Sequence, residues 1–173
     1  MTCIIALRDI NNKTYHLYGD KLWVSNENII NDYSSKIIEY NNMQIGCAGD
    51  YYGYIFSLDY SKEIYNIIKA LYNGNIKYIE ASNQIKNLCD NSFIDKTQTS
   101  FNLLISYCDA LYLIYPDFLI TPLTTDYYAI GSGREVALGA MWVCMHYIDT
   151  DLKSLSDIIL SAVEHTLIDV GTK

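Results

Sequence analysis

Short runs of apolar residues near the start of the chain have the length and composition of β-strands. They form two predicted hairpins, which pair 3–8 (CIIALR) with 14–19 (TYHLYG) and 36–40 (KIIEY) with 43–49 (MQIGCAG). Asn11-Asn12 and Asn41-Asn42 supply the two turns. Between the hairpins, residues 22–33 mix apolar and polar positions, which predicts irregular chain or a short ribbon.

The apolar spacing changes to a helical period at Tyr51 and keeps it as far as Tyr72. The predicted inner positions of this helix are Ile55, Leu58, Ile64, Ile67, Ile68 and Leu71. Asn73-Gly74 ends the helix, because glycine accepts the left-handed backbone of a helix C-terminus. Residues 76–90 then predict a second helix. Its inner positions are Ile79, Ile85 and Leu88.

The rest of the chain repeats this order of strands and then helices. It predicts strands at 101–108 and 111–116, two extended segments within 120–133, and helices over Glu135–Tyr147 and Ser154–Asp169. Ser154 to Asp157 resembles a capping box with Asp in place of Glu. Strands followed by helices indicate an α+β domain built in layers. The strands predicted at 3–7 and 101–106 carry apolar residues on both faces, so both faces of their sheets should be covered.

Composition supports one folded domain over residues 1–173. The chain has a mass of 19.8 kDa, is 50% hydrophobic and only 18% charged, and shows neither a linker nor a repeat. Its net charge of -8 argues against nucleic acid as a ligand and against a polybasic membrane contact. No apolar run approaches the roughly 20 residues that span a bilayer. Arg8 and Asp9 come too early for a signal peptide, which suggests the cytoplasm.

The cysteines and histidines suggest neither a disulfide framework nor a metal centre. Five cysteines are scattered without a CxxC pair, as expected of reduced thiols in the cytosol. Three histidines show no metal-ligand spacing with any of them. We therefore expect no metal and no cofactor.

Thr2 is the first residue with a chemical interpretation of interest. Its small side chain allows an aminopeptidase to remove Met1, which leaves a free amine beside a hydroxyl. The amine, with a pKa near ~8, can take the hydroxyl proton, so one residue supplies both nucleophile and base. Many proteins begin with Met-Thr, so this feature gains weight only from its neighbours.

Asp20 and Lys36 are such neighbours. Asp20 ends the second strand of the opening hairpin and can therefore lie beside Thr2, while Lys36 begins the third strand. A lysine near the hydroxyl lowers the pKa of that hydroxyl, and a carboxylate offsets the cost of burying the lysine. Each residue alone could equally be an ordinary surface charge.

Three further candidate site residues lie at the ends of predicted strands and helices. Gly49 closes the fourth strand before a helix, where its N–H can face a developing oxyanion. Ser132 lies in a Gly-Ser-Gly turn between a strand and a helix, and Asp169 closes the last predicted helix. Taken singly, these are common turn and helix-end residues.

Together these segments resemble the proteasome β-subunit family, which includes the bacterial HslV peptidases. The initial Thr2, the hairpin that ends in Asp20, the KIIEY strand, the GCAG turn, the YAIGSG strand end and the final DVG occur in the family's order. Asp20, Lys36, Ser132 and Asp169 also keep the family's mutual spacing. The resemblance covers essentially the whole chain and implies the four-layer αββα sandwich of N-terminal nucleophile hydrolases.

The resemblance also implies a role for each candidate residue. Thr2 Oγ would be the nucleophile and the amine of Thr2 the proton acceptor, with Lys36 tuning the pKa of the hydroxyl and Asp20 orienting Lys36. Ser132 and Asp169 would hold the amine and its water, and the Gly49 N–H would complete the oxyanion hole. The implied substrate-binding residues are Trp23, Val24, Ile38 and Cys47. Their apolar character suggests cleavage after apolar residues.

The implied activity is a threonine peptidase that acts on peptides or unfolded proteins. The family works as closed homo-oligomeric rings, and an AAA+ unfoldase partner follows from the resemblance alone. Two alternatives stay open: a catalytically silent scaffold or decoy subunit, for example from a phage, and an amidase that acts on a small molecule. If Met1 is retained, Thr2 has no free amine and the mechanism cannot run.

Overall fold

A computed structural model describes residues 3–20, 23–25, 28–30, 36–92 and 100–170, and for 23–25, 28–30 and 167–170 it describes the backbone alone. The strands in these ranges are β1 (Cys3–Asp9), β2 (Thr14–Gly19), β3 (Trp23–Ser25), β4 (Asn28–Ile30), β5 (Ile37–Tyr40), β6 (Met43–Gly49), β7 (Phe101–Tyr107), β8 (Ala110–Ile114), β9 (Ile120–Leu123) and β10 (Tyr127–Gly131). The helices are α1 (Tyr51–Asp59), α2 (Ser61–Tyr72), α3 (Tyr78–Asn91), α4 (Arg134–Tyr147) and α5 (Leu152–Val170).

The longer strands form two antiparallel sheets. The first has the order β10-β1-β2, so the first strand of the chain lies in the middle. The second has the order β5-β6-β7-β8-β9 and is a meander apart from the helices inserted between β6 and β7. Both predicted hairpins are confirmed. The ribbon allowed for at 22–33 is also present, as the pair β3-β4.

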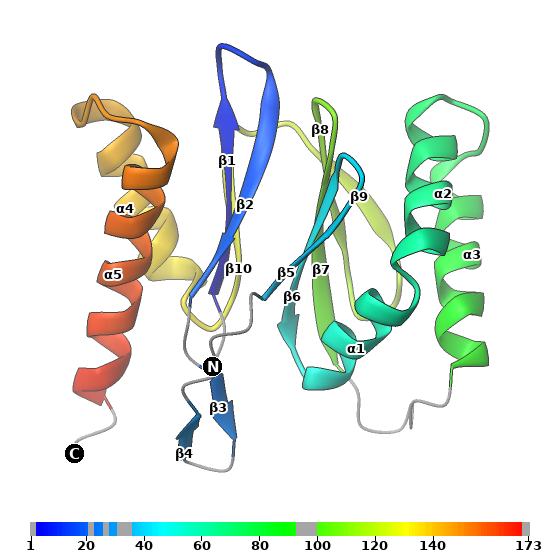
Figure 1. The fold of residues 1–173 in the computed structure, drawn as a ribbon, viewed down its shortest axis with the longest axis horizontal. Helices are drawn as coiled ribbons and strands as arrows, with labels where there is room; N and C mark the ends of the chain where they lie inside the picture. The colour runs from blue at the N-terminus through cyan, green and yellow to red at the C-terminus, as the bar shows by residue number, and fades with distance from the viewer. Residues whose placement is uncertain (1–2, 21–22, 26–27, 31–35, 93–99, 171–173) are drawn as a thin grey trace.

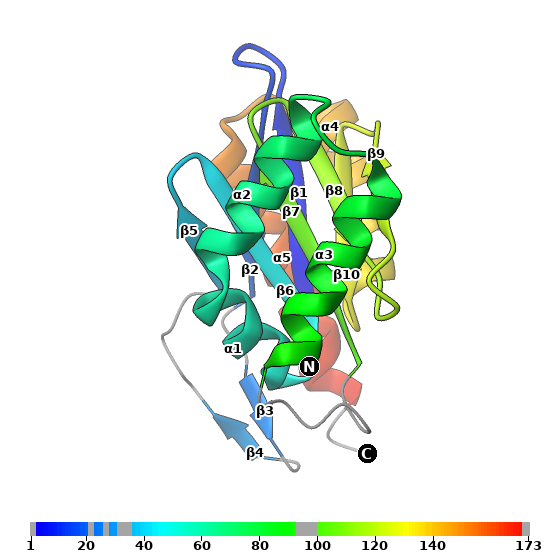
Figure 2. The same cartoon turned by 90° about the vertical axis from the view of Figure 1, so that its right-hand side faces the viewer.

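The two sheets face each other, and helices cover their outer sides (Figure 1). Helices α4 and α5 pack on the first sheet over a core that includes Ile5, Met141 and Ile159. Helices α1, α2 and α3 cover the second sheet, as the side view shows (Figure 2). Between the sheets lie side chains such as Ile4 and Leu104. Cys3 to Leu7 are therefore inaccessible to solvent on both faces of β1, which confirms the expected double coverage.

The helix predicted from Tyr51 to Tyr72 is in fact two helices. It breaks at Tyr60, whose φ of -108° and ψ of 17° end α1 and begin α2. In α1 the core side is formed by Gly53 and Phe56, whereas the predicted inner residue Leu58 is exposed. An unbroken helix turns about 100° per residue, so it would place Phe56 and Ile64 about 80° apart. The break lets both residues be fully buried.

Two further local expectations are wrong. Ile79 is exposed, because the buried face of α3 is formed by Ala81, Ile85 and Cys89, which recur every four residues. The capping box expected at Ser154 is replaced by a cap one turn earlier. Asp151 accepts hydrogen bonds from the Ser154 N–H (3.0 Å) and the Ser154 hydroxyl (2.7 Å), so α5 begins at Leu152.

The sequence predicted no membrane-spanning segment. Within the described ranges, no helix combines the length and the apolar composition needed to cross a bilayer.

Candidate active site

Asp20, Lys36, Gly49 and Ser132 lie at or next to the ends of strands. Cys3, at the start of β1, pairs with Gly131 at the end of β10. On the other side of β1, the Asp20 N–H donates to the Cys3 carbonyl at 3.0 Å, just beyond the last residue of β2. Figure 1 shows the start of β1, the end of β6 and the C-terminal end of α5 at the same end of the molecule. Antiparallel register alone therefore brings Asp20 and Ser132 to the start of β1.

Asp20 and Lys36 form a buried ion pair. The Lys36 ammonium donates to Asp20 Oδ1, and both residues are only 2% exposed. Gly19 allows this close approach, because a Cβ at that position would lie 3.2 Å from the Lys36 Cβ and 3.1 Å from Ile4 Cδ1. Two buried charges are costly to remove from water, and each depends on the other for compensation.

The second carboxylate oxygen of Asp20 is a buried acceptor. Asp20 Oδ2 makes no hydrogen bond with any described residue. Burial raises the pKa of the Asp20 carboxyl above its usual range, although the hydrogen bond and charge of Lys36 and a backbone hydrogen bond with Cys3 act to lower it. A buried acceptor of this kind needs a donor, and this one lies beside the start of β1, where the Asp20 N–H bonds to the Cys3 carbonyl.

Cys3 is unsuited to be the nucleophile. Its side chain is fully buried, and burial together with the charge of Asp20 raises the pKa of the thiol to about 12. The thiol is therefore protonated at neutral pH, and a protonated thiol is a poor nucleophile. Cys3 instead packs against Gly133, where an added Cβ would lie 3.1 Å from the Cys3 Cβ and 2.4 Å from Val163 Cγ1.

Gly49 has a backbone that requires glycine. Its φ is +121°, and an added Cβ would lie 2.4 Å from the Ser100 carbonyl oxygen. The next residue fixes the turn before α1: Asp50 Oδ2 accepts the Ser100 N–H at 2.7 Å, and the Asp50 N–H donates to the Ser100 carbonyl at 3.3 Å. The glycine is exposed at the end of β6, as a residue that presents its backbone to a ligand must be.

Several predicted residues lie wholly or partly outside the described structure. Thr2 is not among the described residues. Trp23 and Val24 are described as backbone in β3, and Asp169 as backbone in the last turn of α5, without their side chains. Ser132 is described, is exposed and directly follows β10.

Ile38 and Cys47 lie in the core between the second sheet and its helices. Both are more than nine-tenths buried, and an added Cβ on Gly53 of α1 would lie 2.6 Å from Cys47 Sγ. Burial raises the pKa of the Cys47 thiol to about 12, so the thiol acts as a small apolar group. Both side chains therefore belong to the core and contribute little to the surface.

Sequence reasoning missed two residues near the ion pair. Glu164 of α5 raises the pKa of Asp20 through its negative charge, and it lines a hollow together with Gly19 and Ile37. Gly133 permits the contact of α4, α5 and β1 described above. No spacing or motif marks Glu164, and Gly133 is visible in the sequence only as the last residue of the Gly-Ser-Gly turn. Among the described residues, no group of three or more His, Cys, Asp or Glu side chains could hold a metal ion.

Comparison with models of protein families gave no match for this sequence. Comparison with curated proteins gave none either. Solved structures do match. HslV from Trypanosoma brucei aligns with a TM-score of 0.70 and 18% identity, over 99% of this chain and 94% of that one. A bacterial proteasome homologue, BPH from Thiobacillus denitrificans, aligns over 95% of this chain and 90% of that one in two structures.

The two BPH structures differ in ligand and in similarity. The complex with epoxomicin gives a TM-score of 0.68 at 17% identity, and the other structure gives 0.64 at 15%. At such identities the agreement concerns the path of the backbone rather than the side chains. It extends over nearly the whole of each chain compared. The chain therefore has a proteasome-β/HslV-like fold.

Proposed function

We propose that this chain is the subunit of a threonine peptidase that uses Thr2, exposed by removal of Met1, as its nucleophile. The observation that carries this proposal is the buried Asp20–Lys36 pair at the start of β1. Burying a lysine against a carboxylate costs desolvation free energy. Apolar side chains of similar volume would stabilise the fold as well, so the pair is not needed for structure alone. At the start of β1, the pair would supply the cation that a terminal nucleophile needs.

The proposed reaction starts from the free amine of Thr2. The amine takes the hydroxyl proton, and Thr2 Oγ attacks the carbonyl carbon of the scissile peptide bond. The C–N bond breaks as the proton passes to the leaving amine, which leaves an ester on Thr2. Water then hydrolyses the ester with the same amine as base. Lys36 favours the ionised hydroxyl by its charge, and Asp20 holds Lys36 in place.

The remaining site residues support these steps. The Gly49 N–H stabilises the oxyanion that forms when the carbonyl is attacked, and the first turn of α1 adds positive potential. Ser132 and Asp169 position the amine of Thr2 and its water. Trp23 and Val24 with Ile38 and Cys47 form the apolar pocket for the residue before the cleaved bond, so cleavage follows apolar residues.

The proposal includes an assembly and a setting. The layered order of two sheets between two helix groups is interpreted as the αββα sandwich of N-terminal nucleophile hydrolases. The chain forms homo-oligomeric rings in the cytoplasm, which enclose the nucleophile and admit peptides or unfolded proteins, with an AAA+ unfoldase as partner. HslV and BPH, the matched structures, support a ring-forming subunit.

The test is intact mass spectrometry of the untagged protein with and without a peptide epoxyketone. Such a probe bonds to a threonine hydroxyl and to the free amine beside it, so it reports both groups at once. We expect loss of Met1 and one adduct per chain, and no adduct in Thr2→Ala. Thr14→Ala is the matched control, because Thr14 lies on β2 at the opposite end of the opening hairpin and should leave the adduct intact.

The alternatives give other results. A retained Met1 without an adduct favours the silent scaffold. An adduct together with turnover of small amides but of no peptide favours the amidase. Unchanged hydrolysis of fluorogenic peptides by Thr2→Ala would refute the threonine mechanism. Light scattering tests the ring, and a stable monomer would contradict it.

A further inference from the structure

The N–H of Gly49, which the proposed mechanism uses for the oxyanion, is directed away from β7. Hydrogen-bonded and non-hydrogen-bonded pairs alternate along an antiparallel ladder. The Asp50 N–H donates to the Ser100 carbonyl at 3.3 Å, so the preceding pair, Gly49 with Phe101, is a non-hydrogen-bonded one. On the other side of β6, the ladder with β5 begins only at Gly46. Among the described strands, none therefore pairs with Gly49 on the side toward which its N–H is directed.

Asp50 completes the last pair of the ladder with its side chain. In a regular pair the Ser100 N–H would donate to the Asp50 carbonyl, but that carbonyl accepts the Gly53 N–H at 3.0 Å where α1 begins. The Ser100 N–H donates instead to Asp50 Oδ2 at 2.7 Å. The carboxylate thus closes the ladder directly beyond Gly49, where a φ of +121° turns the chain toward α1.

This bond is not the one that the position of Asp50 in the helix would predict. Asp50 is the N-cap of α1, and an Asp at an N-cap ordinarily accepts an N–H from the first turn of its own helix. Within the part of the chain that the structure describes, Asp50 makes no such bond. Its carboxylate therefore ties the Gly49 turn to the start of β7 rather than stabilising the helix end.

We propose that Asp50 is a positioning residue, which holds the Gly49 N–H in the direction that the oxyanion requires. This role rests on the proposed function, because that function assigns the oxyanion to the Gly49 N–H. A donor stabilises a developing oxyanion best when it is fixed before the charge forms, and a misplacement of about 1 Å can cost roughly 10²-fold in rate. Gly49 has no side chain that could fix its own peptide by packing, so the two bonds between Asp50 and Ser100 fix it.

The hydrogen bond of Asp50 and its charge have opposite effects on the reaction. A negative charge near a forming oxyanion raises the energy of the transition state, whereas the bond to Ser100 keeps the oxyanion donor in place. An amide oxygen can accept the same N–H without the charge. Asp50→Asn therefore separates the two effects, because it keeps the acceptor and removes the charge.

The test is steady-state hydrolysis of a fluorogenic peptide by the untagged protein. We expect Asp50→Ala to lower kcat about ten-fold and to leave KM within about two-fold, because a loosened oxyanion donor acts on the transition state rather than on substrate binding. Asp50→Asn should keep kcat at or above the parent value. This rescue by an uncharged acceptor would not follow from a role of the charge.

A second truncation guards against loss of the helix start. Serine is as good an N-cap residue as aspartate, but its hydroxyl lies one bond closer to the backbone than the carboxylate oxygens. Asp50→Ser therefore keeps the cap of α1 and removes the bond to Ser100, so its kcat should fall as in Asp50→Ala. Thermal unfolding of each variant shows that the losses are measured on folded protein.

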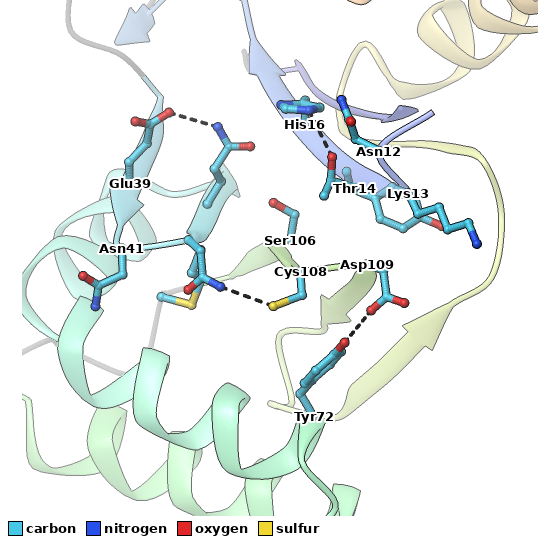
Figure 3. Close-up of a pocket in the computed structure, with 14 residues that line it drawn as sticks. Asn12, Lys13, Thr14, His16, Glu39, Asn41, Tyr72, Ser106, Cys108 and Asp109 are labelled. Carbon is cyan, nitrogen blue, oxygen red and sulfur yellow. Dashed lines mark hydrogen bonds between the residues drawn. The ribbon is translucent and has the colours of Figure 1, made fainter. Parts of the chain in front are cut away.

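Asp109→Ala is the matched control. Asp109 follows β7 at the opposite end of that strand from Ser100, and it accepts one hydrogen bond of the same length, from the Tyr72 hydroxyl at 2.7 Å (Figure 3). The control removes the same side chain and one bond from a turn far from Gly49 along β7. Its kcat should equal that of the parent protein.

Failure of this role and failure of the proposed function give different results. An active parent whose kcat survives Asp50→Ala and Asp50→Ser, or falls equally in Asp50→Asn or Asp109→Ala, refutes the positioning role and leaves the threonine mechanism intact. A rise in KM alone also refutes it, because Asp50 would then act on substrate binding. A parent protein with neither turnover nor an epoxyketone adduct refutes the proposed function, and the role of Asp50 with it.

Discussion

Removing the cation of the buried ion pair should destabilise the fold and make its stability depend on pH. In Lys36→Met the Asp20 carboxylate stays in a site where both side chains have at most 1% exposure, with no compensating charge. Breaking a buried pair in this way costs about 3–5 kcal/mol. For a domain of this size the melting temperature should fall by roughly 6–20 °C.

The sign of the pH effect follows from the pKa of Asp20. Burial already raises that pKa, and loss of Lys36 removes two effects that lower it. The folded variant therefore keeps a proton that the unfolded chain has lost, so its free energy of unfolding falls as pH rises above the ordinary value of 3.8 and through the raised pKa. The parent protein should show the same trend more weakly.

A double-mutant cycle measures this coupling at one fixed protomer concentration. Asp20→Asn leaves Lys36 uncompensated and should also be costly, whereas Asp20→Asn with Lys36→Met removes both charges. We expect the double variant to lose at least about 2 kcal/mol less than the sum of the single losses, measured by urea denaturation. Additive losses, or a loss below about 1 kcal/mol in Lys36→Met, would show that the pair is not buried as described.

Three further predictions follow from the local geometry. Gly49→Ala should lower the free energy of unfolding by roughly 2 kcal/mol or more, because the φ of Gly49 and the Ser100 carbonyl exclude a Cβ. The control Gly74→Ala should lower it by only about 1 kcal/mol, because Gly74 has a φ of +73° but open space around it. Cys3→Ala should retain most peptide turnover, and complete loss of turnover would make the thiol essential after all. Asp151→Ala should lower the stability by about 1 kcal/mol through loss of the α5 cap; an unchanged melting temperature would argue against that cap.

Strand pairing was the part of the fold most accessible from sequence. Asn-Asn turns between apolar runs fix both the hairpin and its register, and the register places Asp20 beside Cys3 without any knowledge of side chains. The ion pair could be anticipated for the same reason. Its full burial could not, because burial depends on α5 and on the approach that Gly19 allows.

Which side of each helix faces the core was harder to predict from the sequence. α1 carries apolar residues all around, so periodicity favoured Leu58 although Phe56 faces the core. No proline or glycine lies at the break at Tyr60, so the sequence did not predict it. Close contacts through Gly53 and Gly133 depend on segments distant in sequence, and a single chain offers no local signal for them.

The central position of β1 sets an order of events during synthesis. β1 is made first, yet it is paired with β10, and the contact between Arg8 and Asp126 spans 118 positions. The candidate site at its start therefore cannot assemble until most of the chain has left the ribosome. Because Cys3 is then fully buried, we expect an aminopeptidase to trim Met1 from the nascent chain, before the first strand is enclosed. Under the proposed threonine mechanism, a truncated product that ends before β10 would carry a processed Thr2 but no assembled site, so it would cleave no peptides.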